Sequence, residues 1–496
     1  MNIRTLLGTA ACLALAGCAI KDPPAGINIM PDSARNQIPG QWAGSHRGGD
    51  VVPNWIRTFG DPELTALVED AIARNPDLKA AAANVEASRA AVRVAAASLY
   101  PRIAMKGLGE RQGQKIHGDL DLGIEPPSLG GLGVENSGGS AMDTSVDSLS
   151  QRWVYGLGIG AAWEADVWGR IRSKKAAAQA ESAALEADYE FARQSLAAAV
   201  ARAYFSTIEA AQQEANAEET LKLYEDYSKL TQDKKKEGHA SDYDVAQIRS
   251  RTAGAKDTYF AAQAARAQAI RAIEVVTSHY PAGKLGVRRS FPSQPKAVPA
   301  GLPAQILERR PDIVAAERRF AAAFHRTNEA RTARLPRFAL SASGGMGTAQ
   351  LDGVGVLDAV MWSLAAGVTQ PIFFGGELKA AQDIRTAEQK AAAASYVGVA
   401  LRAFGNVEDA LAGDYYLLKR EGALNEMVSA SGDAMKFGRE QFDQGQTDMF
   451  TILRLSGENL AARIELTKIR ASRLRERVNL HLALGGDFKG TGAPAK

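Results

Sequence analysis

Cysteine is scarce in this chain: the 496 residues contain two, Cys12 and Cys18, both close to the amino terminus. A fold stapled by several disulfides is therefore excluded. The same region begins with Arg4, continues with an apolar run that starts near Leu6, and ends in small residues, which is the order of a secretory signal peptide. The run is too short for a transmembrane helix. We expect residues 1–17 to be a signal peptide.

Leu15-Ala16-Gly17-Cys18 resembles the lipobox of bacterial lipoproteins, in which cleavage precedes the cysteine and the thiol receives lipid. Cleavage there leaves one cysteine, which is unusual in an exported protein because exported cysteines normally pair. We therefore expect a covalent lipid, diacylglyceryl and N-acyl, on Cys18 and no other cofactor. The alternative is an ordinary signal peptide with an incidental cysteine. Position 19 is alanine rather than aspartate, which resembles the lipoproteins that are sent on to the outer membrane.

The chain also lacks an excess of either charge, a long apolar run and clustered metal ligands. Lys and Arg number 59 against 56 Asp and Glu, a balance that argues against nucleic acid as a partner. No apolar stretch of about 18 residues follows Cys18, so no membrane-spanning helix is expected. The six histidines have no ligand spacing and no nucleophile motif is present, which predicts neither a metal site nor an enzyme. Residues 156–160 (GLGIG) suggest a nucleotide loop only faintly, because they lie within a strand pattern.

The chain repeats itself. Two pairs of prolines are 235 positions apart, and two pairs of glycines are 207 positions apart. These pairs are Pro76 and Pro311, Pro101 and Pro336, Gly169 and Gly376, and Gly238 and Gly445. Chance likeness between alanine-rich helices does not easily give equal spacings, so we predict one structural unit used twice.

The repeat divides the chain into parts. The first repeat is 28 residues longer than the second (235 − 207). Residues 113–150 are rich in glycine and serine and have no helical period. We predict that they form a long loop and account for the extra length. We expect an N-terminal extension at 18–60, a first repeat at 61–280, a proline-rich connector at 281–304, a second repeat at 305–488 and a tail at 489–496.

Alternation of apolar with small or polar residues predicts two strands in each repeat. In the first repeat, Leu157 and Ile159 alternate with Gly156, Gly158 and Gly160. The expected strands are residues 102–111, 153–165, 338–347 and 361–373. One apolar face is typical of a barrel strand that faces lipid. It is equally typical of a half-buried strand in a soluble protein, so the periodicity leaves both interpretations open.

Long helical stretches follow the strands, at residues 170–276 and 377–482. Residues 170–236 contain neither proline nor glycine, and as one helix they would extend about 100 Å. The returning segments keep an apolar spacing that averages about 3.5 residues, which predicts left-handed coiled-coil packing. The two hairpins reverse at glycine-containing turns, residues 236–244 and 443–449.

Seven segments spread over nearly the whole chain carry a resemblance to a known family. They are WIRTFGDPELTALVEDAIARNPDL (55–78), WEADVWGRIR (163–172), LERRPDIVAAE (307–317), QPIFFGGELKAA (370–381), FGNVEDAL (404–411), FDQGQTDMFTIL (442–453) and LHLALGGDF (480–488). In content and order they resemble the TolC-like outer-membrane efflux proteins, specifically the lipidated branch that serves RND-type multidrug pumps.

The resemblance implies a mainly α fold with membrane β-structure. The duplicated unit would form a homotrimer with a twelve-stranded β-barrel, four strands per chain, continued by a long periplasmic α-helical barrel. The implied location is the outer membrane of a Gram-negative bacterium, where lipid would surround the barrel and hold Cys18. The implied function is passive export of small molecules from an inner-membrane RND transporter through a periplasmic adaptor protein.

The resemblance also assigns roles to the two turns. Acidic residues near the tip would constrict the entrance, and the candidates are Asp242, Asp244, Asp443 and Asp448. A ring of carboxylates in a narrow pore attracts cations. The alternative is that these aspartates are helix N-caps, a position that aspartate favours. The turn residues expected to meet the adaptor are Gly238, Ser241, Gly445 and Thr447.

Tight backbone turns are expected where strands pass into helices, because glycine permits conformations closed to other residues. These corners are predicted at Gly169, Pro371, Gly375 and Gly376.

The residues leave three alternative functions open, in two classes. Within the family, the chain could instead export proteins, as in type I secretion, or metal ions. In another class, it could be a coiled-coil spacer lipoprotein without a channel, which explains the lipobox and the helices but not the duplicated strand pairs.

Overall fold

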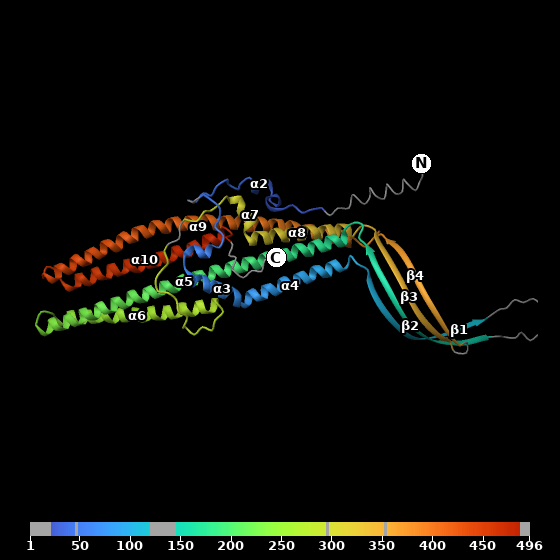
Figure 1. The fold of residues 1–496 in the computed structure, drawn as a ribbon, viewed down its shortest axis with the longest axis horizontal. Helices are drawn as coiled ribbons and strands as arrows, with labels where there is room; N and C mark the ends of the chain where they lie inside the picture. Colours follow the sequence, from blue (N-terminus) through green and yellow to red (C-terminus); the bar gives the residue numbers. More distant parts are fainter. Residues whose placement is uncertain (1–20, 45–47, 120–144, 294–296, 352–354, 487–496) are drawn as a thin grey trace, which may run out of the picture. The chain divides into compact units, whose positions relative to one another are not determined.

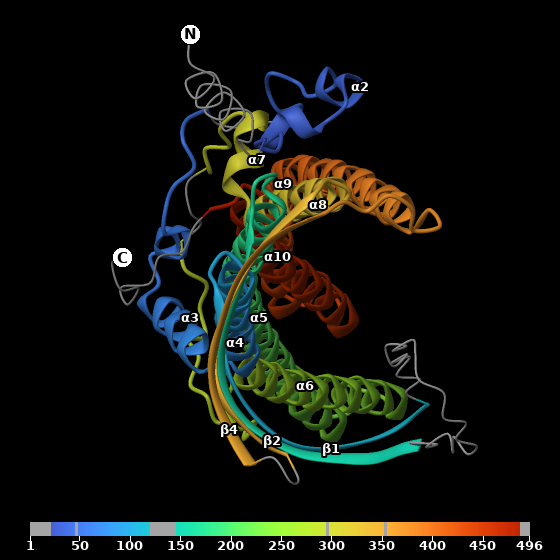
Figure 2. The same cartoon turned by 90° about the vertical axis from the view of Figure 1, so that its right-hand side faces the viewer.

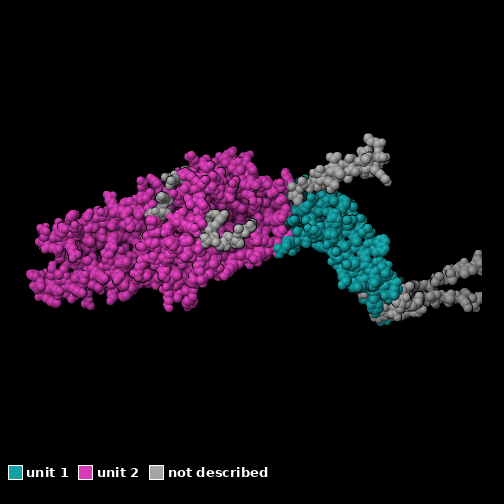
Figure 3. Space-filling model, viewed as in Figure 1, with its two compact units in different colours: residues 1–20, 93–175, 328–382 teal, residues 21–92, 176–327, 383–496 magenta. Residues whose placement is uncertain are grey.

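The computed structural model describes residues 21–44, 48–119, 145–293, 297–351 and 355–486. Cys18 and the signal peptide expected before it lie outside these residues. The chain forms two compact units (Figure 3): unit 1 contains residues 93–175 and 328–382, and unit 2 contains residues 21–92, 176–327 and 383–496. Within the described residues, no helix is both long enough and apolar enough to cross a membrane.

The helices recur in pairs of equal length (Figure 1). The pairs are α4 (Pro76–Ala97) and α8 (Pro311–Thr332) with 22 residues each, α5 (Arg170–Lys236) and α9 (Glu377–Asp443) with 67 each, and α6 (Asp242–Val276) and α10 (Met449–Ala483) with 35 each. The first pair starts 235 positions apart (311 − 76), and the other two start 207 apart (377 − 170 and 449 − 242). The structure thus confirms the duplication.

Shorter elements surround the long helices. They are η1 (Gly26–Ile29), α2 (Asp32–Arg35), η2 (Trp55–Phe59), α3 (Pro62–Arg74), η3 (Pro303–Gln305) and α7 (Ile306–Arg309).

Four antiparallel strands form one sheet in unit 1, in the order β1-β2-β3-β4. They are β1 (Arg102–Asp119), β2 (Ser145–Ala165), β3 (Arg337–Leu351) and β4 (Gly355–Thr369). The pairing of β2 with β3 joins the two repeats in a single curved sheet (Figure 2).

The strand ends differ from those expected. β1 and β2 pair as far as Asp119 and Ser145, so both continue into the 113–150 segment predicted to be a loop; residues 120–144 of it lie outside the described part. The hydrogen bonds between paired strands join backbone groups and do not depend on side chains. Glycine and polar residues can therefore continue a strand when the partner strand is in register. β4 ends at Thr369 and not at residue 373, because Pro371 has no N–H to donate to a ladder.

The register places most of the large apolar side chains of the four strands on one face, with Met361 of β4 on the other. Ile159 lies opposite Met105, Leu157 opposite Met346, and Met346 opposite Val360. These side chains are exposed, and Trp362 on the same face of β4 is 82% exposed. Among the described residues, this apolar face of the sheet is therefore exposed.

The opposite face of β2 and β3 is lined by small residues. Gly158 pairs with Gly345, and Gly156 pairs with Gly347. The two strands approach so closely that a Cβ atom added to Gly345 would lie 2.8 Å from the carbonyl oxygen of Leu157 and 2.9 Å from Cα of Gly158.

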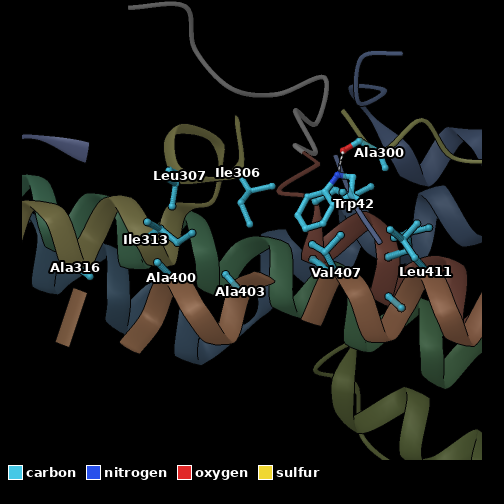
Figure 4. Packing of buried hydrophobic residues seen from close by; sticks show 14 of the residues in the cluster. Trp42, Ala300, Ile306, Leu307, Ile313, Ala316, Ala400, Ala403, Val407 and Leu411 are labelled. Carbon is cyan, nitrogen blue, oxygen red and sulfur yellow. Dashed lines mark hydrogen bonds between the residues drawn. The ribbon is translucent and has the colours of Figure 1, made fainter. Parts of the chain in front are cut away.

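The N-terminal segment packs against the helices of unit 2. The Trp42 indole lies among Ile306, Val407 and Leu411 and donates a 3.2 Å hydrogen bond to the Ala300 carbonyl (Figure 4). The backbone N–H groups of residues 43 and 44 each donate a 2.8 Å hydrogen bond to the Glu408 carboxylate. These contacts attach both the N-terminal extension and the inter-repeat connector to α9.

A second core in unit 2 surrounds Trp55, whose ring stacks on His481 with centroids 5.5 Å apart. His481 is 1% exposed, and neither of its ring nitrogens has a hydrogen-bond partner among the described residues. Burial, and secondarily the nearby Arg477, lowers the pKa of His481 from 6.5 to about 3. The imidazole is therefore neutral in the folded protein.

We expect Gly345→Ala to destabilise the sheet, because the new methyl group would meet fixed backbone atoms rather than a movable side chain. A cost of about 1–3 kcal/mol is typical of such overpacking. Gly344→Ala is the matched control, since nothing lies within 4 Å of its added Cβ. The measurement is the thermal unfolding temperature of both variants by circular dichroism. Equal stability of the two variants would contradict the close approach of β2 and β3.

We expect His481→Phe to remove a pH-dependent loss of stability. Between pH 6.5 and about 3, the unfolded chain binds a proton at this histidine and the folded chain does not. Stability conferred by the neutral ring is therefore complete above pH 6.5 and declines as the pH falls, by up to about 1.4 kcal/mol per pH unit. Phenylalanine keeps the stack on Trp55 without titrating. Unfolding midpoints at pH 7.5 and 4.5 should fall less for the variant than for the natural chain; parallel falls would refute the assignment.

Candidate functional site at the helical turns

The two hairpin turns have the same backbone structure. Gly238 and Gly445 have φ of +78° and +72°, the left-handed conformation that glycine adopts without strain. The N–H of Gly238 donates to the carbonyl of Lys235, and the next N–H donates to the carbonyl of Lys234. The same two bonds occur at Gly445, so both α5 and α9 end in a Schellman motif.

The helices that leave the turns are capped at equivalent positions. Ser241 is the N-cap of α6, and Asp448, 207 positions later, is the N-cap of α10. The Asp448 carboxylate accepts a 2.7 Å hydrogen bond from the N–H of Thr451. Asp244 completes a capping box, because its carboxylate accepts 2.8 Å bonds from the N–H and the hydroxyl of Ser241. These bonds lower the pKa of Asp244.

The other two gate candidates differ from these caps. Asp242 lies in the first turn of α6 and forms an ion pair with Lys235 across the turn. Asp443 is the last residue of α9, where a carboxylate is opposed by the helix dipole. Asp443 forms no hydrogen bond or ion pair with the part of the chain that the structure describes. Capping therefore explains Asp244 and Asp448, but it does not explain Asp443.

The residues expected to meet an adaptor all lie in the two turns. Gly238, Ser241 and Gly445 are exposed, and Thr447 is half-buried.

A small apolar cluster holds the two hairpins together near the turns. It joins Tyr227 of α5, Ile248 of α6, and Ile452 and Leu453 of α10. The ammonium group of Lys234 on α5 also lies 4.4 Å from the ring centroid of Phe442 on α9. A cation over an aromatic face contributes about 0.5–1 kcal/mol at an exposed site.

Ion pairs along α10 connect it with both long helices, and the sequence analysis missed them. Arg463 makes a bidentate ion pair with Glu219 of α5, with N–O distances of 2.8 and 2.7 Å. Hydrogen bonds from Arg463 lower the pKa of Glu219. On the other side of α10, Arg473 pairs with the buried Glu421 of α9. Aligning the two repeats would have revealed part of this pattern, because Arg266 and Glu214 stand at the positions equivalent to Arg473 and Glu421.

The residues expected at the strand-to-helix corners lie between β2 and α5 and between β4 and α9. Gly169, Gly375 and Gly376 all have positive φ, of 77°, 57° and 87°. In the first repeat, the Asp166 carboxylate accepts bonds of 3.0 and 2.8 Å from the first N–H groups of α5.

The second corner contains Pro371 and has an apolar surface in place of this cap. Ile372 is 93% exposed and Phe373 is 86% exposed. These two residues follow β4 in the chain and add to the exposed apolar surface of the sheet.

A groove of about 920 Å³ runs along α5, α6 and α10, lined mainly by small side chains such as those of Ala217, Ser250 and Ala262. Within the described residues, no three His, Cys, Asp or Glu side chains come together as metal ligands do.

Comparison with known proteins gives a consistent result. The sequence model of the family described as "Outer membrane efflux protein" matches residues 67–278 and 302–486. The toluene efflux pump outer membrane proteins TtgC and TtgF of Pseudomonas putida are 29% and 30% identical to the chain; the alignments cover 93% and 97% of it, and 93% and 96% of the relatives. The solved structure of the outer-membrane channel OprN has a TM-score of 0.77 at 26% identity, covering 95% of this chain and 98% of that one.

We expect alanine substitution to separate the aspartates that cap helices from Asp443. Asp448→Ala should destabilise the start of α10 by about 1 kcal/mol, because the N–H of Thr451 loses its acceptor. Asp443→Ala should be neutral or slightly stabilising, because it removes a carboxylate from a helix C-terminus. Amide hydrogen exchange in residues 440–455 measures both effects. Faster exchange in Asp443→Ala than in Asp448→Ala would contradict this division.

Proposed function

Because the chain belongs to the outer membrane efflux protein family, we propose that it is the exit duct of a tripartite efflux system. In this proposal, small molecules leave passively through a homotrimer that spans the outer membrane. An inner-membrane RND-type transporter supplies them through a periplasmic adaptor protein, which meets the turns at Gly238 and Gly445.

The exposed apolar face of the sheet is the observation that carries the proposal. β1 and β4 are the outer strands of a four-stranded sheet, and each pairs on one side only among the described residues. Lipid does not tolerate unpaired backbone N–H and C=O groups. Three copies, with 3 × 4 = 12 strands, would pair every edge and turn the face that carries Leu157 and Trp362 toward lipid.

The proposal includes a lipid on Cys18, diacylglyceryl and N-acyl, that anchors the chain in the inner leaflet of the outer membrane. Support comes from the Leu15-Ala16-Gly17-Cys18 sequence. The N-terminal segment that follows is attached to α9 through Trp42 and Glu408, so an anchor at Cys18 would hold the helical unit.

We assign the gate at the periplasmic end to Asp443. Its carboxylate lies at a helix end where it has no capping function, and three copies would place three such carboxylates around the axis. Rings of carboxylates give pores a preference for cations.

Small organic molecules are the favoured cargo, since TtgC and TtgF are described as components of toluene efflux pumps. Protein export and metal-ion export remain the alternatives within the family. A coiled-coil spacer without a channel is disfavoured, because it would leave the exposed apolar face of the sheet without a function.

Single-particle electron microscopy of the protein, purified from outer membranes in mild detergent, tests the duct. We expect particles with threefold symmetry, a continuous lumen, and detergent around the sheet. Monomeric or dimeric rods without a lumen would overturn the proposal in favour of the spacer.

The same preparation in planar bilayers tests the gate. The natural protein should pass cations in preference to anions, and Asp443→Asn should reduce that preference, as measured by the reversal potential in a salt gradient. Asp448→Asn is the control, because asparagine also caps helices. An unchanged reversal potential in Asp443→Asn would remove Asp443 from the gate without affecting the duct.

A further inference from the structure

The two helical hairpins share specific contacts as well as lengths. Arg266 of α6 pairs with Glu214 of α5 at 2.7 Å, and 207 positions later Arg473 of α10 pairs with Glu421 of α9. The side chain of Thr252 bonds to the backbone of residue 224, and the amide of its equivalent, Asn459, bonds to the side chain of residue 431. Residues 207 positions apart therefore make equivalent contacts in the α5–α6 hairpin and in the α9–α10 hairpin.

Within one chain the hairpins join through α10 and α5. Arg463 of α10 makes its bidentate pair with Glu219 of α5, and Arg475 of α10 pairs with Glu209 of α5 at 2.7 Å. The order of the four helices is thus α9, α10, α5 and α6, with α9 and α6 on the outside, as Figure 2 shows.

The outer helices α6 and α9 carry residues at the positions equivalent to the ion pair between Arg463 and Glu219. The position of Arg463 on α10 corresponds to Lys256 on α6 (463 − 207), and that of Glu219 on α5 corresponds to Glu426 on α9 (219 + 207). Both side chains are exposed, they have opposite charges, and neither forms an ion pair within the part of the chain that the structure describes. The ammonium group of Lys256 lies 6.0 Å from the ring centroid of Phe260 on the same helix.

We propose that α6 of one copy packs against α9 of the next copy as α10 packs against α5, with Lys256 paired to Glu426 of the adjacent copy. The occupant of this surface is a second copy of the same chain, because the repeat itself provides the template for the joint. The inference rests on the proposed homotrimer and adds to it the register of the helices at the subunit boundary.

The second ion pair between α10 and α5, Arg475 with Glu209, has no charged equivalent on α6 and α9. The register at the subunit boundary therefore depends on the equivalent of the first pair. The equivalents of Arg475 and Glu209 are Gln268 and Tyr416, neither of which is charged. Tyr416 is 65% exposed in the single chain, as expected of a side chain that another copy would cover.

Cross-linking tests the register. Lys256→Cys and Glu426→Cys are combined in the full chain, and the outer-membrane protein is treated with a short bismaleimide and separated in denaturing detergent. We expect covalent dimers and trimers that neither single variant gives. The single variants also report any reaction through the natural cysteines.

Two further double variants are matched controls. Glu219→Cys with Arg463→Cys reproduces the template joint and should cross-link within one chain, leaving monomers. Lys256→Cys with Glu440→Cys moves one thiol 14 positions along α9, about 21 Å along the helix axis, and should give no multimers. Multimers from this displaced pair would overturn the register.

Charge reversal gives a second measurement that does not depend on cysteine. Lys256→Glu and Glu426→Lys should each lower the temperature at which the native oligomer dissociates, and the double reversal should restore it. Trimers of normal size with no cross-link and no restoration would overturn this inference while leaving the proposed duct intact. Absence of any trimer in the natural protein would overturn both.

Discussion

Backbone hydrogen bonding at the edges of the four-stranded sheet is the constraint on which the rest of the structure depends. Within the described residues, β1 and β4 each leave one row of N–H and C=O groups unpaired, and an unpaired edge is a template for another strand. In lipid such an edge is not tolerated at all. The proposed oligomer therefore follows from the strands before any consideration of cargo. The helices, which continue from the same chain, then have to adopt whatever symmetry the strands impose.

The duplication makes this symmetry easier to satisfy. A ring of three identical chains, each with two hairpins, has two kinds of contact between hairpins: those within a chain and those between neighbouring chains. Here α5 and α9 have the same length, and so do α6 and α10, with the pair Arg266–Glu214 repeated as Arg473–Glu421. Contacts within a chain and between chains can then be nearly equivalent, so one hairpin geometry is used six times in a trimer.

The sequence predicted the long helices, the turns and the strand faces, because each depends on a local pattern: helical spacing, alternation, or a glycine with positive φ. It predicted the repeat because prolines and glycines recur at fixed separations. Strand length was not predictable in the same way, since residues 113–119 of β1 are held by their register with β2 and not by their own composition. The ion pair of Arg463 with Glu219 joins residues 244 positions apart, and the sequence alone gives no sign of the distance between them. The capping function of Asp448 was foreseen as an alternative, but only the hydrogen bond to Thr451 decided it.

Differences between the repeats are more informative about function than similarities. Positions that both halves share, such as Gly238 and Gly445, are explained by the backbone conformation that each turn requires. Lys236 and Asp443 occupy one equivalent position, the last residue of α5 and of α9 (236 + 207). A lysine there is favoured by the helix dipole and a carboxylate is disfavoured by a comparable amount, about 0.3–1 kcal/mol at an exposed site. The fold therefore gains nothing from the aspartate, and a residue that opposes local stability at an exposed helix end requires an explanation outside the fold. A charge needed at the entrance of the proposed duct provides that explanation.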